Sequence, residues 1–218
     1  NWIDWNWTNT INYMTTLDKH SINVMGGYTM EKFSEYWVLG SRENTPSNLE
    51  ELQYINAGTM NQKSEGTNAY STLISYLGRL MYNYDGRYYL TASIRVDGSS
   101  KFPTGSKYAT FPAVSGAWRI SQEEFFNVPA ISNLKLRLNW GQLGNQSVSG
   151  RYPTIATLSN MSVLMGQGGY NHSIVPGYYV ANLVNKDLKW ETTTITNAGV
   201  DVGLLDNRLT ASAEYYDK

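Results

Sequence analysis

The sequence predicts an all-β fold: an antiparallel, up-and-down segment of a transmembrane β-barrel with about eight strands, which forms an open curved sheet when taken alone. Three observations support this prediction. Strand after strand alternates apolar with polar residues, and the polar set carries charge. Short and long connections alternate along the chain. The chain also has 17 Tyr and 7 Trp against 5 Phe, and such amphipathic rings are enriched where a barrel meets the membrane interfaces.

The first part of the chain contains three expected strands. Trp5–Thr16 keeps Trp, Ile and Tyr in phase with one another and out of phase with Thr and Asn. Ile22–Glu31 alternates apolar residues and Gly with mostly polar ones. In Tyr76–Tyr84, tyrosines and a leucine oppose a set that includes Arg79 and Asn83. A period of two over such lengths is typical of strands with two different faces.

The clearest alternation lies in Tyr88–Asp97. Because a strand shows alternate side chains to opposite faces, its Leu, Ala, Ile and Val residues share one face, and Arg95 and Asp97 share the other with Thr and Ser. Ala113–Ile120 repeats the pattern with Arg119 on the polar side. An apolar face opposite a charged face is typical of a barrel wall between lipid and a wet lumen.

Three further strands are expected in the last part of the chain. Leu134–Trp140 sets three leucines and a tryptophan against Lys135, Arg137 and an asparagine. Trp190–Val202 is a weaker pattern because threonines interrupt it. Leu209–Tyr215 opposes apolar residues to Thr, Ser and Glu. These segments complete the count of about eight strands.

The connections divide into two kinds. Short ones are expected at Asp18 and Lys19, at Asp85 and Gly86, which is a type I′ hairpin signal, and at Leu205–Asn207. The connection from Ser121 to Ser132 is predicted to form a one-turn helix, with Ser121 as its cap and Pro129 closing it.

The long polar connections are expected at Gly40 to Asn68, Asp97 to Lys107 and Gly144 to Leu188. In an up-and-down barrel successive connections lie at opposite ends, so all short turns gather at one rim and all long loops at the other.

Alternation also predicts which side chains face lipid and which face the lumen. The residues expected to face lipid are Leu90, Ala92, Ile94, Val96, Leu134, Leu136, Leu138, Leu209, Ala211 and Ala213. The residues expected to face the lumen are Arg95, Asp97, Arg119, Lys135, Arg137, Glu191, Asp201 and Glu214. We expect the four cations to form ion pairs with the four carboxylates.

Several functions are disfavoured. A formal charge of −1, with no basic stripe, argues against a nucleic-acid partner. No segment approaches the roughly 18 apolar residues of a membrane helix. The chain has no Gly-x-Ser-x-Gly or His-Glu-x-x-His motif, so no enzyme activity, cofactor or metal is expected. The ligand-binding candidates are instead polar and aromatic residues of the last long loop: Tyr152, Tyr170, Asn171, His172, Tyr178 and Tyr179.

Four blocks of sequence resemble a known family. They are Ser75–Phe102, Phe111–Phe125, Leu134–Gln146, and Asp187–Thr194 followed by Leu209–Asp217. In order and spacing they resemble the barrel of SusC/RagA-type TonB-dependent outer-membrane transporters, over nearly the whole chain.

The resemblance implies a place in the bacterial outer membrane, in contact with its lipid, within a wider 22-stranded barrel. It implies uptake of oligosaccharides or peptides, a SusD-like surface lipoprotein over the external loops, and energy from the TonB complex acting through a plug domain. We expect residues 1–218 to be a partial barrel domain without the signal peptide, the plug or the end of the barrel, because an exported chain carries a signal. The alternative is a self-contained soluble β-barrel or sandwich module that binds carbohydrate.

Overall fold

The computed structural model describes residues 1–150, 152–165 and 173–218. The described part is built from strands and three short 3-10 helices. The strands are β1 (Trp2–Leu17), β2 (His20–Glu43), β3 (Met60–Tyr84), β4 (Tyr88–Ser99), β5 (Tyr108–Arg119), β6 (Ile131–Asn145), β7 (Leu158–Met165), β8 (Ser173–Val180), β9 (Glu191–Leu204) and β10 (Leu209–Asp217). The 3-10 helices are η1 (Glu50–Leu52), η2 (Ile55–Ala57) and η3 (Ile120–Gln122). No helix in these ranges is long and apolar enough to cross a membrane.

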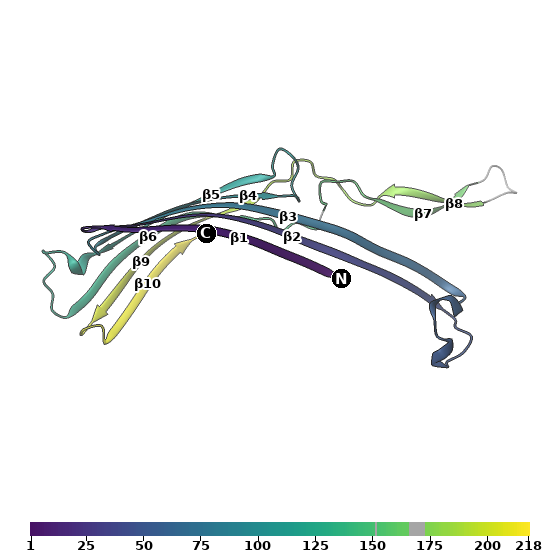
Figure 1. The fold of residues 1–218 in the computed structure, drawn as a ribbon, viewed down its shortest axis with the longest axis horizontal. Coiled ribbons are helices and arrows are strands. Elements are labelled where there is room, and N and C mark those ends of the chain that lie inside the picture. The colour runs from purple at the N-terminus through teal and green to yellow at the C-terminus, as the bar shows by residue number, and fades with distance from the viewer. Residues whose placement is uncertain (151, 166–172) are drawn as a thin grey trace.

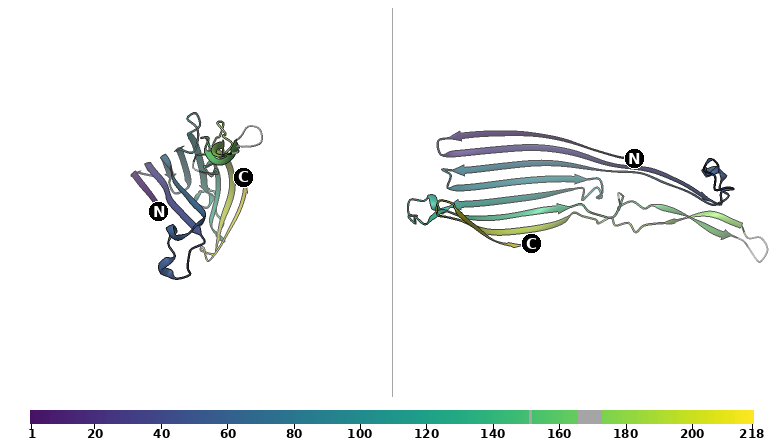
Figure 2. Two further views of the ribbon diagram at one scale, coloured as in Figure 1. Left: turned by 90° about the vertical axis from the view of Figure 1, so that its right-hand side faces the viewer. Right: turned by 90° about the horizontal axis from the view of Figure 1, so that it is seen from below.

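The main sheet is an antiparallel meander that confirms the predicted fold class. Its strand order is β1-β2-β3-β4-β5-β6-β9-β10, so β1 and β10 are its two edges. The sheet is curved and open, with the edges on opposite sides (Figures 1 and 2). Open curvature of this kind is expected of strands taken from a wide barrel, since only the complete set of strands can close.

Two strands are far longer than predicted. The expected loop from Gly40 to Asn68 is partly the continuation of β2 and β3, which pair from His20 and Tyr84 as far as Glu43 and Met60. Strands of 24 and 25 residues reach about 80 Å, whereas a transmembrane strand needs about 9–11 residues. The two strands therefore extend as a ribbon well beyond the rest of the sheet (Figure 2).

The long connection from Gly144 to Leu188 also contains structure that was not predicted. The strands β7 and β8 pair from Leu158 and Val180 to Met165 and Ser173, and they form a separate two-stranded sheet. Figure 1 shows this hairpin projecting from the main sheet. The total is thus ten strands in the described ranges, eight of them in the main sheet.

The short turns lie at one end of the sheet and the long connections at the other, as predicted (Figure 2). Asp85 and Gly86 have φ of 53° and 66°, and the Arg87 N–H donates to the Tyr84 carbonyl, which fits a type I′ turn. The helix prediction after β5 was correct in kind, but its cap was wrong. Helix η3 begins at Ile120, so Ser121 lies inside it, and no side chain caps its start.

Rings on the apolar face form two rows. The first follows the short-turn end, where His20 contacts Tyr84, Tyr84 contacts Tyr88, and Tyr88 stacks on Trp118 with 6.4 Å between centroids. The second row joins Trp7, Tyr28 and Tyr76, with 5.2 Å between the two tyrosines.

The two rows mark the limits of an apolar band. On β3, Tyr76 and Tyr84 are about 27 Å apart along the strand, of the same order as the roughly 25 Å apolar band of outer-membrane barrels. Apolar side chains between the two rows are exposed: Leu90 is 45% and Leu138 is 66% exposed. This face has the pattern of a surface that contacts lipid.

Candidate functional site

The polar face carries a hydrogen-bonded network across β6, β9 and β10. Arg137 donates from Nε and Nη2 to the two oxygens of Asp201, at 2.9 and 3.0 Å. Asp201 also accepts from the Ser212 hydroxyl at 2.8 Å. Glu214 lies 3.9 Å from Arg137 and accepts from the Asn197 amide. The network consists of side chains from three neighbouring strands, so it depends on the strand register.

A second part of the polar face links β4, β5 and β6 through an aromatic ring. The Lys135 ammonium lies 5.2 Å and the Arg119 guanidinium 5.8 Å from the centre of the Tyr89 ring. Both distances suit cation–π contacts. Each of these cations therefore contacts a ring, and neither forms an ion pair within the described residues.

The third part is an ion pair on β4 beside β3. Arg95 donates from Nε to both oxygens of Asp97, at 2.8 and 2.9 Å, and from Nη2 to the Ser75 hydroxyl at 3.0 Å. Asp97 is 7% exposed and Ser75 is 3% exposed. Hydrogen bonds to two partners, Asp97 and Ser75, thus hold the Arg95 guanidinium in one orientation.

Register places every predicted lumen-facing residue on one face of the sheet. Asp97, Asp201 and Glu214 have the expected arginine partners. Glu191 differs, because it accepts from the Asn145 amide at 2.8 Å and forms no ion pair in the described part of the chain.

A buried aromatic cluster was missed at the sequence level. Phe102 stacks on Trp190 at 4.9 Å between centroids, and Phe111 meets Trp190 edge-on at 5.5 Å. The Trp190 indole donates to the Lys107 carbonyl at 3.0 Å, and Phe102 is 1% exposed. Phe102 lies in a loop, Phe111 near the start of β5 and Trp190 directly before β9. All three belong to blocks of sequence that carry the family resemblance, and this membership was the signal that could have identified them.

The cluster lies where β6 separates from β5. The two strands pair only from Arg119 and Lys135 to Ala113 and Gly141, whereas β6 continues to pair with β9 as far as Asn145. The Phe111 ring packs where a β-carbon on Gly144 would sit, so glycine permits the close approach.

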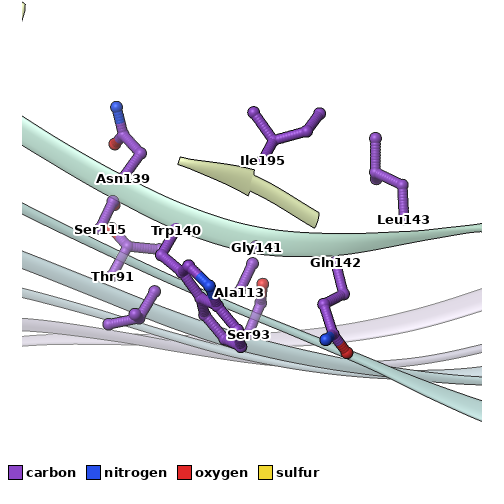
Figure 3. Close-up of a pocket in the computed structure, with 11 residues that line it drawn as sticks. Thr91, Ser93, Ala113, Ser115, Asn139, Trp140, Gly141, Gln142, Leu143 and Ile195 are labelled. Atoms are coloured by element: carbon purple, nitrogen blue, oxygen red, sulfur yellow. The ribbon is translucent and has the colours of Figure 1, made fainter. Parts of the chain in front are cut away.

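Three adjoining cavities follow this separation. The first, of about 260 Å³, is lined by Asn139, Leu143 and Ile195 among others, and Figure 3 shows Gln142 pointing to the opposite side of β6 from Leu143. The second, of about 430 Å³, lies beside Arg95. The third, of about 510 Å³, extends to Asp4 on β1. Their shared lining residues join them into one trough.

The predicted loop candidates that the structure describes, Tyr152, Tyr178 and Tyr179, lie in different local settings. The Tyr152 hydroxyl accepts a hydrogen bond from the Tyr70 backbone N–H at 3.1 Å, and the centroids of the two rings lie 6.4 Å apart in an edge-on contact. Tyr152 therefore packs the loop against β3. Tyr178 and Tyr179 are neighbours in β8 and therefore point to opposite faces of the hairpin. Tyr170, Asn171 and His172 lie outside the described residues.

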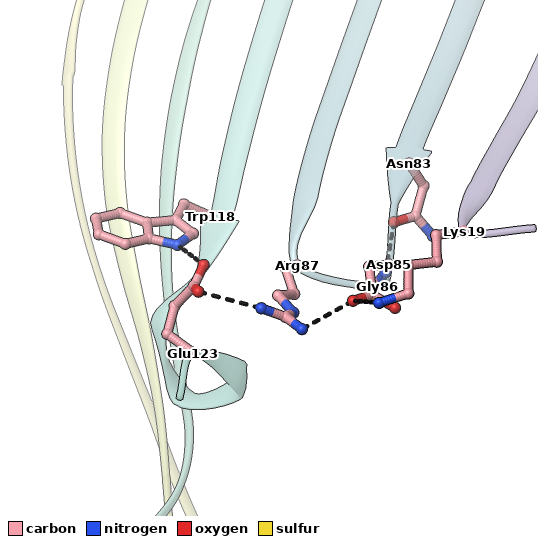
Figure 4. Close-up of polar contacts among 7 residues, drawn as sticks. All are labelled: Lys19, Asn83, Asp85, Gly86, Arg87, Trp118 and Glu123. Carbon is pink, nitrogen blue, oxygen red and sulfur yellow. Dashed lines mark hydrogen bonds and ion pairs between the residues drawn. The ribbon is translucent and has the colours of Figure 1, made fainter. Parts of the chain in front are cut away.

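A chain of charges joins three turns at the short-turn end (Figure 4). Asp85 lies 3.3 Å from Lys19 and 2.8 Å from Arg87, and Arg87 lies 3.3 Å from Glu123. Glu123 also accepts from the Trp118 indole at 2.8 Å.

These contacts shift the ionisation of two side chains in the turns. Hydrogen bonds from Tyr88 and then Trp118 lower the pKa of Glu123, with help from Arg87. Partial desolvation opposes the charge of Arg87, but Asp85 and Glu123 outweigh it and raise its pKa. The turns are therefore held together best when all these groups are charged.

Comparison with known proteins gives one consistent result. The model of the family described as TonB dependent receptor-like, beta-barrel matches residues 2–218. TonB-dependent receptor P3 of Formosa agariphila is 32% identical over 217 residues, which cover 97% of this chain and 21% of that protein. TonB-dependent receptor SusC of Bacteroides thetaiotaomicron is 37% identical over 151 residues, 67% of this chain and 14% of that protein.

A solved structure has the same fold. A chain of the RagAB peptide transporter superposes with a TM-score of 0.82 and 24% sequence identity, over 99% of this chain and 23% of that one. The present chain thus spans about a fifth of the length of the relatives it matches end to end.

Proposed function

Because this chain belongs to the TonB-dependent receptor-like β-barrel family, we propose that it forms part of the wall of an importer that carries oligosaccharides or peptides across the bacterial outer membrane. The proposal concerns the whole protein, of which residues 1–218 are a partial barrel domain. The relatives that support it are named as TonB-dependent receptors.

One observation carries the proposal from the residues themselves. The same strands present a bare apolar face, bounded by two rows of aromatic rings, and an opposite face on which charged side chains are paired. The first face suits contact with lipid, because its apolar side chains need no hydrogen-bond partners. The second face suits a wet lumen, where the eight polar residues from Arg95 to Glu214 would line the path of a solute.

The proposed partners follow from the family. A SusD-like surface lipoprotein would cover the end that carries the β2–β3 ribbon and the β7–β8 hairpin, and the TonB complex would supply energy through a plug domain. Tyr178 and Tyr179, which are 71% and 50% exposed, remain candidates to contact the solute or that lipoprotein. No catalytic role is proposed, since the matched relatives are named as receptors.

The alternative of a self-contained soluble carbohydrate-binding module is not favoured. Such a module would need closed or covered edges, whereas β1 and β10 are both open in the described sheet. It would also need an apolar interior, whereas the buried apolar residues within the described ranges are Leu73, Phe102 and Phe111.

The experiment is uptake by cells that carry the complete transporter and the neighbouring lipoprotein. We expect uptake of a labelled oligosaccharide or peptide that stops when the transporter gene is deleted and when an uncoupler removes the proton-motive force. Uptake that persists in the presence of the uncoupler would indicate a passive pore, and no transporter-dependent uptake of either class would refute the proposal.

A further inference from the structure

We propose that the cavity beside Arg95 is a binding subsite for a neutral, hydroxyl-rich solute, that is, for one or two units of an oligosaccharide. This inference rests on the proposed import function and narrows it, because it names the substrate class and the residues that would hold it.

The cavity is formed where β6 passes over the polar face of its neighbours. It has a volume of about 430 Å³ and is lined by β3, β4, β5, the end of β6 and Trp190. This volume lies within the range of small-molecule sites, about 300–1,000 Å³.

The cavity wall is rigid. Trp190 is held by Phe102, Phe111 and the Lys107 carbonyl, so it cannot swing into the space. Asp97 lies nearly buried beneath Arg95 and fixes its guanidinium through both carboxylate oxygens. A preorganised wall of this kind reduces the entropy that is lost when a solute binds.

Unused hydrogen-bonding groups face this space. Arg95 uses Nε and Nη2 for Asp97 and Ser75, which leaves Nη1 available. Gln142 and Gln146 also line the cavity, and their amides make no side-chain hydrogen bond to any described residue. Each amide can donate and accept, which matches a hydroxyl, since a hydroxyl also does both.

The charge balance selects a neutral solute. Asp97 compensates Arg95 directly, and no other charged residue lines this cavity among the described residues. An anionic or cationic solute would lose its hydration without gaining a net opposite charge. Leu73 and Leu77 supply apolar contact for the C–H groups of a sugar ring.

The continuity of this cavity with its neighbours indicates that the solute is an oligosaccharide and not a single sugar. The cavity on one side shares Ser93, Ala113, Gln142 and Leu143 with it, and the cavity on the other side shares Leu73 and Gln146. An extended chain could therefore occupy several positions along the trough while one or two units contact the amides.

The test is protection of a cysteine in the complete transporter. Residues 1–218 contain no cysteine, and any elsewhere are replaced by serine. In outer-membrane vesicles, Gln142→Cys is labelled with a maleimide in the presence of neutral oligosaccharides from α-glucan, β-glucan, mannan and xylan, or of a tryptic digest of casein. We expect at least a fivefold slower reaction with one of the neutral oligosaccharides and no change with the peptides. Ser162→Cys, on the exposed hairpin, is the matched control and should react equally in all cases.

Uptake of the same solutes by cells separates the two proposals. Gln142→Ala should raise the oligosaccharide concentration for half-maximal uptake about tenfold, while Ser162→Ala leaves it unchanged. Protection by peptides alone would overturn the saccharide assignment. Transporter-dependent oligosaccharide uptake without protection at position 142 would overturn the subsite and leave the importer intact, and absence of all uptake and protection would overturn both.

Discussion

Trp190 shows how one residue can join parts of the chain that are distant in sequence. It precedes β9, yet it packs against Phe102 from the loop after β4 and Phe111 from β5. Alternation places residues on faces, and in this way it identified the charged set from Arg95 to Glu214. It could not identify this cluster, because the contacts arise only where β6 leaves β5 and lets the rings enter.

Removal of a ring from this cluster should therefore destabilise the barrel. Phe102→Ala should lower the free energy of unfolding of the complete barrel by about 3–5 kcal/mol, since it leaves a cavity in a site that is 1% exposed. Urea unfolding in lipid vesicles measures this. Phe125→Ala is the control, because Phe125 is 70% exposed, and a loss as large there would mean that burial is not the cause.

The charge chain at the turns should make stability depend on pH. The folded pKa of Glu123 is lowered, so its stabilisation is complete above the unfolded value of about 4.3 and is lost as pH falls through the folded value. Wild type should exceed Glu123→Gln in melting temperature at neutral pH, and the difference should shrink below about pH 4.5. Thermal melts of the two barrels in detergent test this, and a difference that grows in acid would contradict it.

At the scale of elements, the sequence located strands well and their ends poorly. Turn chemistry placed the hairpin at Asp85 and Gly86 correctly, because positive φ restricts the choice of residues. The ends of β2 and β3 beyond the membrane were missed, since Tyr36–Glu43 and Met60–Thr67 are solvated on both faces, and alternation then loses its physical cause.

The apolar face of the strands gives a prediction for lipid contact. Leu136→Arg should destabilise the complete barrel by about 2–4 kcal/mol if the residue lies near the middle of the bilayer. Its neighbour Lys135 lies on the opposite face, so Lys135→Arg should change stability by less than about 0.5 kcal/mol. Urea unfolding in vesicles distinguishes the two, and equal effects would refute the assignment of faces.

The separation of turns and loops predicts their accessibility on whole cells. A membrane-impermeant maleimide should label Ser162→Cys in the β7–β8 hairpin and should not label Asp206→Cys in the β9–β10 turn, because these lie at opposite ends of the sheet. Permeabilised cells should label at both positions. Labelling of the turn alone on intact cells would invert the proposed orientation.

The molecule as a whole is an open structure with two unpaired edges and an uncovered apolar face. The predicted lack of closure follows from the breadth of the parent barrel, since eight strands with that curvature leave β1 and β10 too far apart to pair. The trough was not predicted, because it depends on β6 crossing over other strands, a long-range feature that periodicity does not record.

This openness predicts the behaviour of the chain when expressed alone. Residues 1–218 without detergent should associate and should bind the dye ANS, since both the apolar face and the edges are exposed. Sedimentation velocity and dye fluorescence measure this. A cooperative monomer that does not bind ANS would contradict it and would restore the soluble binding module.

The β2–β3 ribbon limits how homologous proteins can differ in length. It continues for about 50 Å past Tyr28 and Tyr76, in uninterrupted register almost to its tip. A single inserted residue would exchange the two faces of everything beyond it, so insertions and deletions should occur in pairs and in both strands together. The bulge between Ser41 and Glu43 lies at the tip, where one extra residue changes the register of almost no further strand pairs. The reach of this ribbon above the membrane can therefore evolve only in steps of about 7 Å.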